Sequence, residues 1–97
     1  MEFDTNAIEV VHNRERRRFE VQLGDQIAEL SYHMVNDAYA MTHTGVPVEF
    51  RGRGIADRLA EAALDHAQAE GRQVIPMCSF IQTYIRRHKK YAGLVAG

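Results

Sequence analysis

The sequence predicts an α+β protein in which four antiparallel strands precede a helix, a fifth strand and a second helix. Over residues 8–43, apolar residues recur at every second position between short polar turns, as in half-buried strands. From Gly54 to about Glu70 they recur at spacings of three and four, as on one face of a helix. A meander with one packed face needs a covering layer, so the helices are expected to lie against it. The expected order is ββββ-α-β-α.

The alternation gives four strands, at residues 8–12, 18–23, 28–34 and 38–48. Turn signals separate them, at Asn13–Glu15, Gly24-Asp25 and Asn36-Asp37. The side chains that share the alternating apolar register are Ile8, Val10, His12, Phe19, Val21, Leu23, Ala28, Leu30, Tyr32, Met34, Tyr39, Met41 and His43.

The second half supplies the covering helices. The long helix presents one apolar face, made by Ile55, Leu59, Ala62, Ala63 and Ala67. Gly71 is expected to end this helix, because glycine adopts the left-handed conformation that helix ends require. A short strand follows at residues 73–77. Ser79, with Gln82 three residues later, resembles a capping box that starts a helix from Phe80 to about His88, and residues 91–95 are expected to form a last turn.

Size and charge restrict the class of ligand. A chain of 97 residues has room for one domain, expected to span residues 1–97. Residues 1–50 carry 4 Arg or Lys and 9 Asp or Glu, a net charge of −5, whereas residues 51–97 carry 8 and 4, a net charge of +4. The second half is therefore the better place for an anionic ligand. The overall charge of −1 disfavours non-specific nucleic-acid binding, which usually needs a basic protein.

Several classes of protein are not expected. Cys78 is the single cysteine, so no intrachain disulfide can form, and no apolar stretch approaches the ~20 residues that span a bilayer. The acidic N-terminus lacks an apolar signal core, so a cytoplasmic location is expected, with no membrane partner. The histidines show no metal-binding spacing, so no metal is expected; they are His12, His33, His43, His66 and His88.

The segment Arg51-Gly52-Arg53-Gly54-Ile55-Ala56 is the most informative motif. It lies between a strand and a helix, where two glycines allow the backbone to curl and approach a ligand closely. The first amides of the helix point outward at its positive end, and this combination binds phosphate. No Lys-Ser/Thr follows, so the segment is no Walker loop, and Asp57 stands where a dinucleotide fingerprint has its third glycine. A bare helix start and a nucleic-acid contact are the remaining alternatives.

Arg51-x-x-Gly54-x-Ala56, placed between a strand and an amphipathic helix, resembles the Arg/Gln-x-x-Gly-x-Gly/Ala motif of the GNAT acetyltransferase superfamily. The wider strings His43–Pro47, Val74–Phe80 and Tyr84–His88 resemble a minimal GNAT group, the N-acetyltransferase domain-containing protein 1 type. The resemblance covers nearly the whole chain. Longer GNAT enzymes place two helices between their first two strands, where this chain has only the turn at Asn13–Glu15. The resemblance therefore implies truncated N-terminal helices and an acceptor site that is truncated or borrowed from a partner.

The resemblance implies that acetyl-CoA lies in a splayed gap between the strands at residues 38–48 and 73–77. Its pantetheine would pair with the backbone near His43 to Val48, and its pyrophosphate would sit on the amides of Arg51 to Ala56. The residues expected to bind acetyl-CoA are His43, Thr44, Gly45, Val46, Val48, Arg51, Gly52, Arg53, Gly54, Ile55, Ala56, Ser79, Tyr84, Arg87, His88, Lys89 and Lys90.

Three residues are candidates for catalysis. Cys78 precedes a helix, where the dipole stabilises a thiolate, and the minimal GNAT group carries a candidate cysteine at the matching position. His43 is a base or orients that thiol, and Tyr84 matches a tyrosine that protonates the departing CoA thiolate in many longer GNAT enzymes. Each has a structural alternative: a small core residue for Cys78, a structural side chain for His43, core packing for Tyr84.

Three further residues or runs have both a functional and a structural interpretation. His66, near the apolar stripe of the long helix, is expected to be structural. Glu49 is a general base or a solvated side chain. The basic run at residues 86–90 is a solvated helix end or contacts the 3′-phosphate of CoA.

The expected function is acetyl transfer from acetyl-CoA to an amine on a small molecule or a protein, by direct attack or through an acetylated Cys78. A non-catalytic acyl-CoA-binding or regulatory module is the alternative, favoured by the short turn after the first strand. A nucleic-acid-binding domain ranks last, because the strands lack a base-stacking aromatic pattern.

Overall fold

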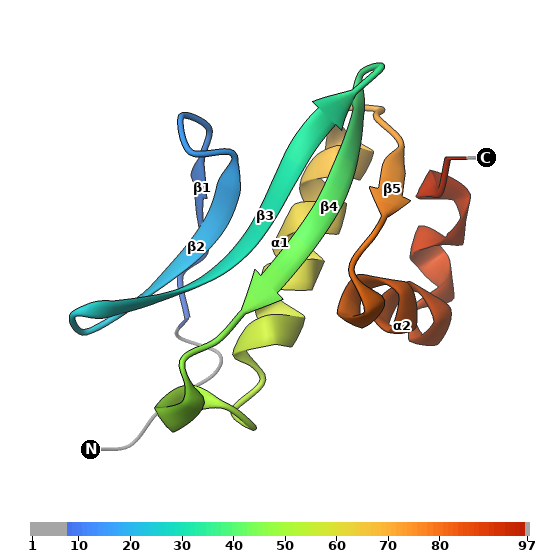
Figure 1. Cartoon of the computed structure of the whole chain (residues 1–97). Coiled ribbons are helices and arrows are strands. Elements are labelled where there is room, and N and C mark those ends of the chain that lie inside the picture. Colours follow the sequence, from blue (N-terminus) through green and yellow to red (C-terminus); the bar gives the residue numbers. More distant parts are fainter. Residues whose placement is uncertain (1–7, 97) are drawn as a thin grey trace.

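A computed structural model describes residues 8–96 of the chain (Figure 1). One five-stranded sheet, with strand order β1-β2-β3-β4-β5, carries helices on one face. The strands are β1 (Val11–Asn13), β2 (Arg18–Leu23), β3 (Gln26–Val35), β4 (Ala38–Gly45) and β5 (Val74–Pro76). The helices are η2 (Val48–Phe50), α1 (Ile55–Ala69), α2 (Ser79–Arg87) and η3 (Lys89–Leu94), of which η2 and η3 are 3-10 helices. The predicted ββββ-α-β-α order is confirmed.

Two of the predicted hairpin turns form where the turn residues stand. Gly24 adopts a φ of 64° between β2 and β3, whose end residues Leu23 and Gln26 pair directly. Asn36 and Asp37 have φ values of 49° and 67°, the left-handed pair that a type I′ hairpin needs. Both turns bring consecutive strands side by side, so β1 to β4 form the expected antiparallel meander.

The first strand and its turn were predicted wrongly by a few residues. β1 begins at Val11 rather than residue 8, and the turn occupies residues 14–17 instead of residues 13–15. Asn13 ends the strand, and its side-chain Oδ1 accepts a hydrogen bond from the amide of Arg16 at 3.1 Å. That bond, with Arg17 at a φ of 54°, moves the turn further along the chain.

The core lies between the sheet and α1. Phe19, Leu30 and Met41 are buried on the sheet, and the side chains that α1 buries are Ile55, Leu59, Ala60, Ala63, Leu64 and Ala67. The predicted stripe omitted Ala60 and Leu64 and included Ala62, which is only half-buried. The buried stripe is wider than predicted because α1 packs against the sheet on one side and against α2 and η3 on another.

Both ends of α1 are formed by glycine. Gly54 is the N-cap, with φ 80° and ψ 11°, and Gly71 follows the last turn with a φ of 69°. The amide of Arg72 donates to the carbonyl of Ala67 at 2.9 Å, and the amide of Gly71 donates to that of Gln68 at 3.1 Å. These bonds form a Schellman motif, so the predicted helix end at Gly71 is confirmed.

Two expectations about the long hairpin of β3 and β4 are corrected. Met34 shares the inward register but is 41% exposed, because it lies near the end of the hairpin at residues 36–37. β4 ends at Gly45 rather than residue 48, and Val48–Phe50 forms the 3-10 turn η2. Pro47 has no amide hydrogen and cannot continue a strand ladder, which explains the early end.

The C-terminal elements differ in detail from the prediction. β5 pairs with β4 in parallel and covers Val74–Pro76 rather than residues 73–77. The capping box at Ser79 does not form: Cys78 is the N-cap, Ser79 is the first helical residue, and Gln82 donates its side-chain amide to the carbonyl of Pro76 at 2.9 Å. α2 therefore covers Ser79–Arg87 rather than residues 80–88. The predicted last turn is η3, followed by a bridge between Val95 and Val74.

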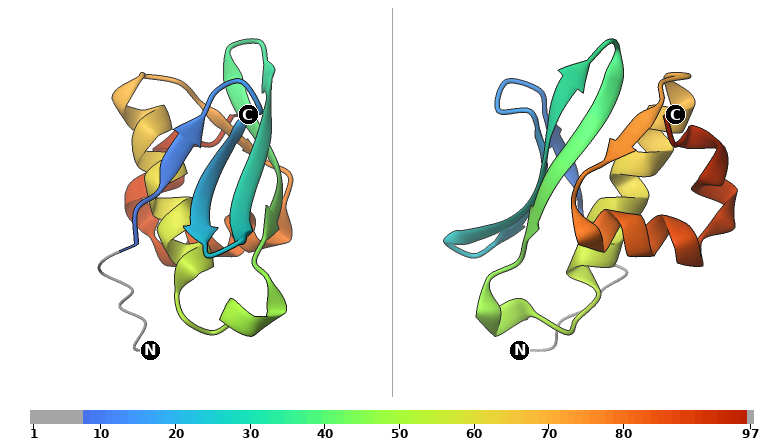
Figure 2. Two further views of the ribbon diagram at one scale, coloured as in Figure 1. Left: turned by 90° about the vertical axis from the view of Figure 1, so that its left-hand side faces the viewer. Right: turned by 45° about the vertical axis from the view of Figure 1, so that its right-hand side comes forward.

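The helices α1, α2 and η3 lie on one side of the sheet (Figure 2). Ala28, Leu30 and Tyr32 of β3 are buried on the helix side, so odd-numbered residues between them, such as Glu29, face the opposite side. That opposite face, called here the outer face, carries no helix within residues 8–96. Within the same range, no helix is both long and apolar enough to cross a membrane.

Candidate acetyl-CoA site

β4 has an open edge. Its pairing with β5 ends at Met41 and Pro76, and the carbonyl of Met41 accepts the amides of both Met77 (3.0 Å) and Cys78 (3.1 Å). Beyond this point β5 gives way to α2, whereas β4 continues to Gly45 and pairs only with β3. Within the described residues, the edge of β4 that faces away from β3 therefore has no strand partner from residue 42 to residue 45. An extended group can form main-chain hydrogen bonds along such an edge.

A β-bulge determines which side chains of β4 face the helices. Tyr32 pairs with Met41 but Ser31 pairs with His43, so Thr42 is an extra residue that has no register partner on β3. The extra residue inverts the alternation. Thr44 lies opposite the buried Leu30 on the helix side, and His43 is exposed on the outer face.

The thiol of Cys78 lies beside this part of β4. Its Sγ is 3.8 Å from the hydroxyl Oγ1 of Thr44, to which it donates. Cys78 is half-buried and extended, with φ −87° and ψ 132°, at the N-cap of α2. The structure therefore brings the cysteine to the open edge of β4, and the side chain that the thiol contacts is Thr44, not His43.

The glycine-rich turn and the first helical amides form a concave backbone surface at the start of α1, called here the amide cradle. Gly52 and Gly54 have φ values of 78° and 80°, which curl the chain around the helix end. The first helical hydrogen bond runs from the amide of Arg58 to the carbonyl of Gly54 at 3.1 Å. The amides of the three helical residues before Arg58, residues 55–57, thus have no helical acceptor, and glycine at the N-cap offers no side-chain cap. These residues fit a diphosphate.

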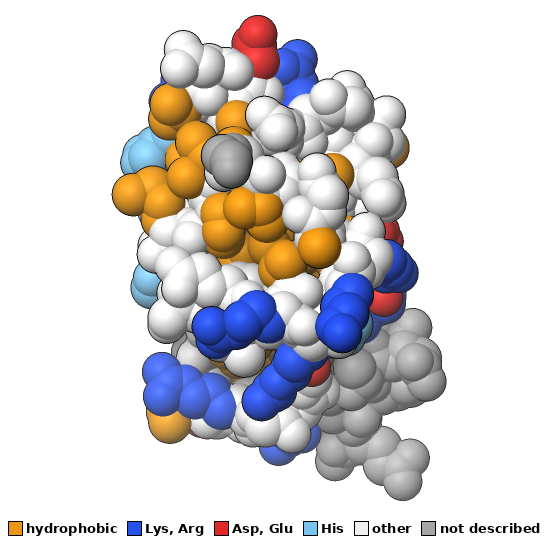
Figure 3. Space-filling view, turned by 90° about the vertical axis from the view of Figure 1, so that its right-hand side faces the viewer, with side chains coloured by type: hydrophobic (Ala, Val, Ile, Leu, Met, Phe, Trp, Pro, Cys, Tyr) orange, Lys and Arg blue, Asp and Glu red, His pale blue; other side chains and the backbone are white. Residues whose placement is uncertain are grey.

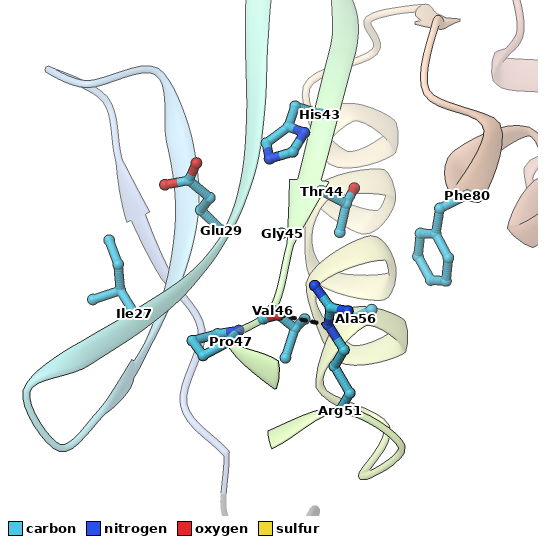
Figure 4. A pocket seen from close by; sticks show the side chains of 10 residues that line it. All are labelled: Ile27, Glu29, His43, Thr44, Gly45, Val46, Pro47, Arg51, Ala56 and Phe80. Carbon is cyan, nitrogen blue, oxygen red and sulfur yellow. Dashed lines mark hydrogen bonds between the residues drawn. The ribbon is translucent and has the colours of Figure 1, made fainter. Parts of the chain in front are cut away.

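A cavity, called the main cavity, connects the cradle with the open edge (Figure 4). It has a volume of about 630 Å³ and is lined by Ile27, Glu29, His43, Thr44, Gly45, Val46, Pro47, Arg51, Ala56 and Phe80. A smaller hollow of about 240 Å³ lies over Gly52 and Gly54 and shares Val46, Arg51 and Ala56 with the larger cavity. Arg51 stands between the two and donates from its Nε to the carbonyl of Val46 at 3.0 Å.

The structure therefore gathers most of the predicted loop and strand residues around two cavities that share lining residues. Sequence analysis missed Ile27, Glu29, Pro47 and Phe80 as lining residues. Ile27 and Glu29 alternate with the buried residues of β3, a signal that places them on the outer face, but nothing in the sequence shows that the cavity reaches them.

Other predicted binding residues lie outside both cavities. Val48 is 68% exposed on η2, and Ser79 is exposed on the first turn of α2. The exposed side chains around the junction of α2 and η3 are Arg86, Arg87, His88, Lys89 and Lys90. Figure 3 shows Lys and Arg side chains gathered on the lower part of this face. None of these five side chains lines either cavity, and four of them, all but His88, carry a positive charge.

Tyr84 belongs to the core of the helical layer. It is 7% exposed, and its ring stacks on that of His88 at a centroid distance of 4.0 Å. Burial raises the pKa of its hydroxyl, and the carboxylates of Glu61 and Asp57 on α1 raise it further. Tyr84 therefore faces α1 and lines neither cavity.

His66 and Glu49 have partners away from the main cavity. His66 lies 3.3 Å from Glu70 near the far end of α1, where Glu70 also accepts a hydrogen bond from the hydroxyl of Tyr39. Glu49 accepts a hydrogen bond from the side chain of Gln26 at 2.6 Å. Among residues 8–96, no group of three or more potential ligands could hold a metal ion.

Known proteins resemble this chain in sequence and in fold. The family described as GCN5-related N-acetyl-transferase matches residues 18–94. Protein NATD1 of Xenopus tropicalis is 37% identical over 87 residues, which cover 87% of this chain and 80% of that protein. Protein NATD1 of Homo sapiens is 38% identical over 84 residues, covering 84% and 74%. The NMR structure of a GCN5-like protein from Staphylococcus aureus superposes with a TM-score of 0.72 at 26% identity, covering 92% of this chain and 88% of the other.

The chain belongs to the GCN5-related N-acetyltransferase family, because the family match spans most of its length and the fold agrees. The resemblance to the N-acetyltransferase domain-containing protein 1 type, drawn from the loop and strand motifs, is confirmed by the NATD1 relatives.

Proposed function

We propose that this protein binds acetyl-CoA and transfers the acetyl group to an amine. The observation that carries the proposal is the continuity of three features: the open edge of β4, the amide cradle at the start of α1, and the thiol of Cys78. Acetyl-CoA has three parts of matching chemistry, namely an amide-bearing arm, a diphosphate and a thioester.

The proposed contacts follow from the donors and acceptors of each segment. The backbone of residues 42–45 pairs with the pantetheine arm, as a strand partner would. The amides of residues 55–57 bind the diphosphate, with Arg51 and Arg53 supplying positive charge. Lys89, Lys90 and Arg87 attract the 3′-phosphate from the surface at the end of α2.

Two routes of transfer are consistent with this arrangement. In direct attack, the amine nitrogen bonds to the acetyl carbonyl carbon, the carbon–sulfur bond breaks, and CoA leaves as a thiolate while a base takes the proton of the amine. In the covalent route, the Cys78 thiolate attacks first, CoA leaves, and the acetyl group then passes from Cys78 to the amine. Cys78 fits the second route because Thr44 holds its sulfur at the open edge of β4.

One observation favours a weaker alternative, a module that binds acyl-CoA with little transfer. The turn at residues 14–17 stands where longer family members have two helices, so the outer face has no helical wall within the described residues to enclose an acceptor. Detectable turnover with any amine distinguishes the enzyme from the module. With one cysteine and no disulfide to protect, we also propose a reducing compartment such as the cytosol.

The test combines binding and mass measurement. Calorimetry with acetyl-CoA establishes binding, and intact mass after incubation with acetyl-CoA, followed by peptide mapping, shows whether Cys78 becomes acetylated. The covalent route predicts an acetyl group on Cys78 that moves to an added amine, and no adduct on Cys78→Ala. If Cys78→Ser transfers the acetyl group at the wild-type rate, the covalent route is excluded and direct attack is supported. Binding without turnover would leave the module, and no binding would overturn the proposal.

A further inference from the structure

The main cavity passes from one side of the sheet to the other. Ala56 and Phe80 line it on the helix side, whereas Ile27 and Glu29 line it on the outer face (Figure 4). The two sides meet at Gly45, near the end of β4. If acetyl-CoA fills the helix side, as proposed above, the part over Ile27 and Glu29 remains for the second substrate.

The cavity is electrically polarised. Its lining contains two side chains with a full charge, Arg51 at the helix side and Glu29 on the outer face. Arg51 suits an anion such as CoA, so the negative charge of Glu29 marks the other end for a cation.

Glu29 is fixed in position but not neutralised. Nη1 of Arg18 is 3.1 Å from Oε2 of Glu29, and the same guanidinium binds Glu20, so the three side chains together carry a charge of −1. The other oxygen of Glu29, Oε1, has no hydrogen bond or ion pair to any of residues 8–96. One carboxylate oxygen is therefore held, and the other is available to a ligand.

A candidate base, the imidazole of His43, lines the same cavity as Glu29. Glu29 of β3 pairs with Gly45 of β4. His43 of β4 pairs with Ser31 and lies on the same face of the sheet as Glu29. The ring of His43 folds over Gly45, since a Cβ added at Gly45 would be only 3.0 Å from Nε2 of His43. Glycine at this position thus allows the imidazole to occupy the space beside Glu29.

We propose that Glu29 is the acceptor-recognition residue and that the acceptor is an alkylamine, bound in its protonated form. This inference rests on the proposed function. The ammonium group binds the available oxygen of Glu29, and the His43 imidazole removes one proton, which leaves a free amine beside the open edge of β4. The freed nitrogen bonds to the acetyl carbonyl carbon of acetyl-CoA, or of acetylated Cys78, and the carbon–sulfur bond breaks. The second proton that the nitrogen loses neutralises the displaced thiolate.

The test compares two amines that differ in charge. Alkylamines such as α-blocked lysine are cationic at neutral pH, whereas arylamines are neutral. Glu29→Gln is expected to raise the KM for α-blocked lysine about tenfold, the loss expected for one hydrogen bond to a charged group. The KM for the arylamine and the affinity for acetyl-CoA stay unchanged. A lysine-containing peptide, run in parallel, shows whether the acceptor amine is free or part of a chain.

Glu20→Gln is the matched control, because Glu20 binds the same Arg18 but does not line the cavity. It is expected to leave the KM for both amines near the wild-type value. Equal effects of the two substitutions, or an equal rise for alkylamine and arylamine with Glu29→Gln, would mean that the carboxylate acts only through the structure of the sheet and would overturn the inference.

Binding tests the inference separately from catalysis. In NMR titrations of the CoA-bound protein, α-blocked lysine is expected to shift the amide signals of Glu29 and Gly45 in the wild type and not in Glu29→Gln. Such shifts without turnover would refute the proposed acetyl transfer but support the binding of a cation by Glu29. Turnover with no such shifts and no change of KM would keep the enzyme and refute the role of Glu29.

Discussion

The two glycines at the ends of α1 allow a sharp test of the amide cradle. Gly54 and Gly71 both adopt left-handed conformations, with φ values of 80° and 69°. An alanine in this conformation costs about 1–2 kcal/mol. Gly54→Ala and Gly71→Ala are therefore expected to lower the free energy of unfolding by similar amounts, whatever their effect on ligand binding.

The two variants are expected to differ in CoA affinity. Gly54 precedes the three helical amides that have no helical acceptor, whereas Gly71 lies at the opposite end of the helix with no atom within 4 Å of an added Cβ. If alanine at residue 54 turns one of these amides away from the diphosphate, a hydrogen bond to a charged group of about 1.5–3 kcal/mol is lost. That loss corresponds to a roughly ten- to hundredfold weaker affinity in Gly54→Ala.

The assay is calorimetry with CoA, paired with denaturant unfolding of each variant. The expected result is a similar loss of stability in both proteins and a loss of affinity in Gly54→Ala alone. Wild-type affinity in Gly54→Ala would refute the placement of the diphosphate. An equal loss of affinity in Gly71→Ala would show that binding follows stability rather than the geometry of the cradle.

If the surface at the end of α2 attracts the 3′-phosphate, CoA binds the wild type more tightly than dephospho-CoA does, and Lys89→Ala/Lys90→Ala removes the difference in calorimetry. Burial, with His66 and Arg14 nearby, lowers the pKa of His12 from 6.5 to about 4. Between these pH values His12 is protonated in the unfolded chain and neutral in the folded protein. The free energy of unfolding therefore falls as the pH drops from about 6.5 to about 4. Urea unfolding of His12→Phe is expected to show a smaller fall. Leu64→Ala, in the core, is expected to cost about 2–5 kcal/mol.

The sequence by itself determined the features that depend on neighbouring residues. Alternation along residues 18–23 placed β2 and its buried side chains correctly, and Asn36-Asp37 specified a turn because these residues tolerate positive φ. The glycines of residues 51–56 predicted the tight turn before α1, since the requirement for positive φ at such a turn is local. These features need no knowledge of what the chain packs against.

Only the tertiary structure decided the features that depend on pairing between distant segments. The bulge at Thr42 arises from the register between β3 and β4, and it exchanges the faces of His43 and Thr44. Cys78, rather than Ser79, became the N-cap because its amide continues the bonding of β5 to Met41.

The extent of the main cavity is the clearest example of a feature that depends on the tertiary structure. In the sequence, Glu29 resembles any other solvated charge in a strand. In the structure it lines the main cavity, which forms around Gly45 where β4 is no longer paired with β5. The alternation of side chains predicts which face of a sheet a residue occupies. The point at which β4 and β5 separate depends on how the whole sheet packs against α1 and α2.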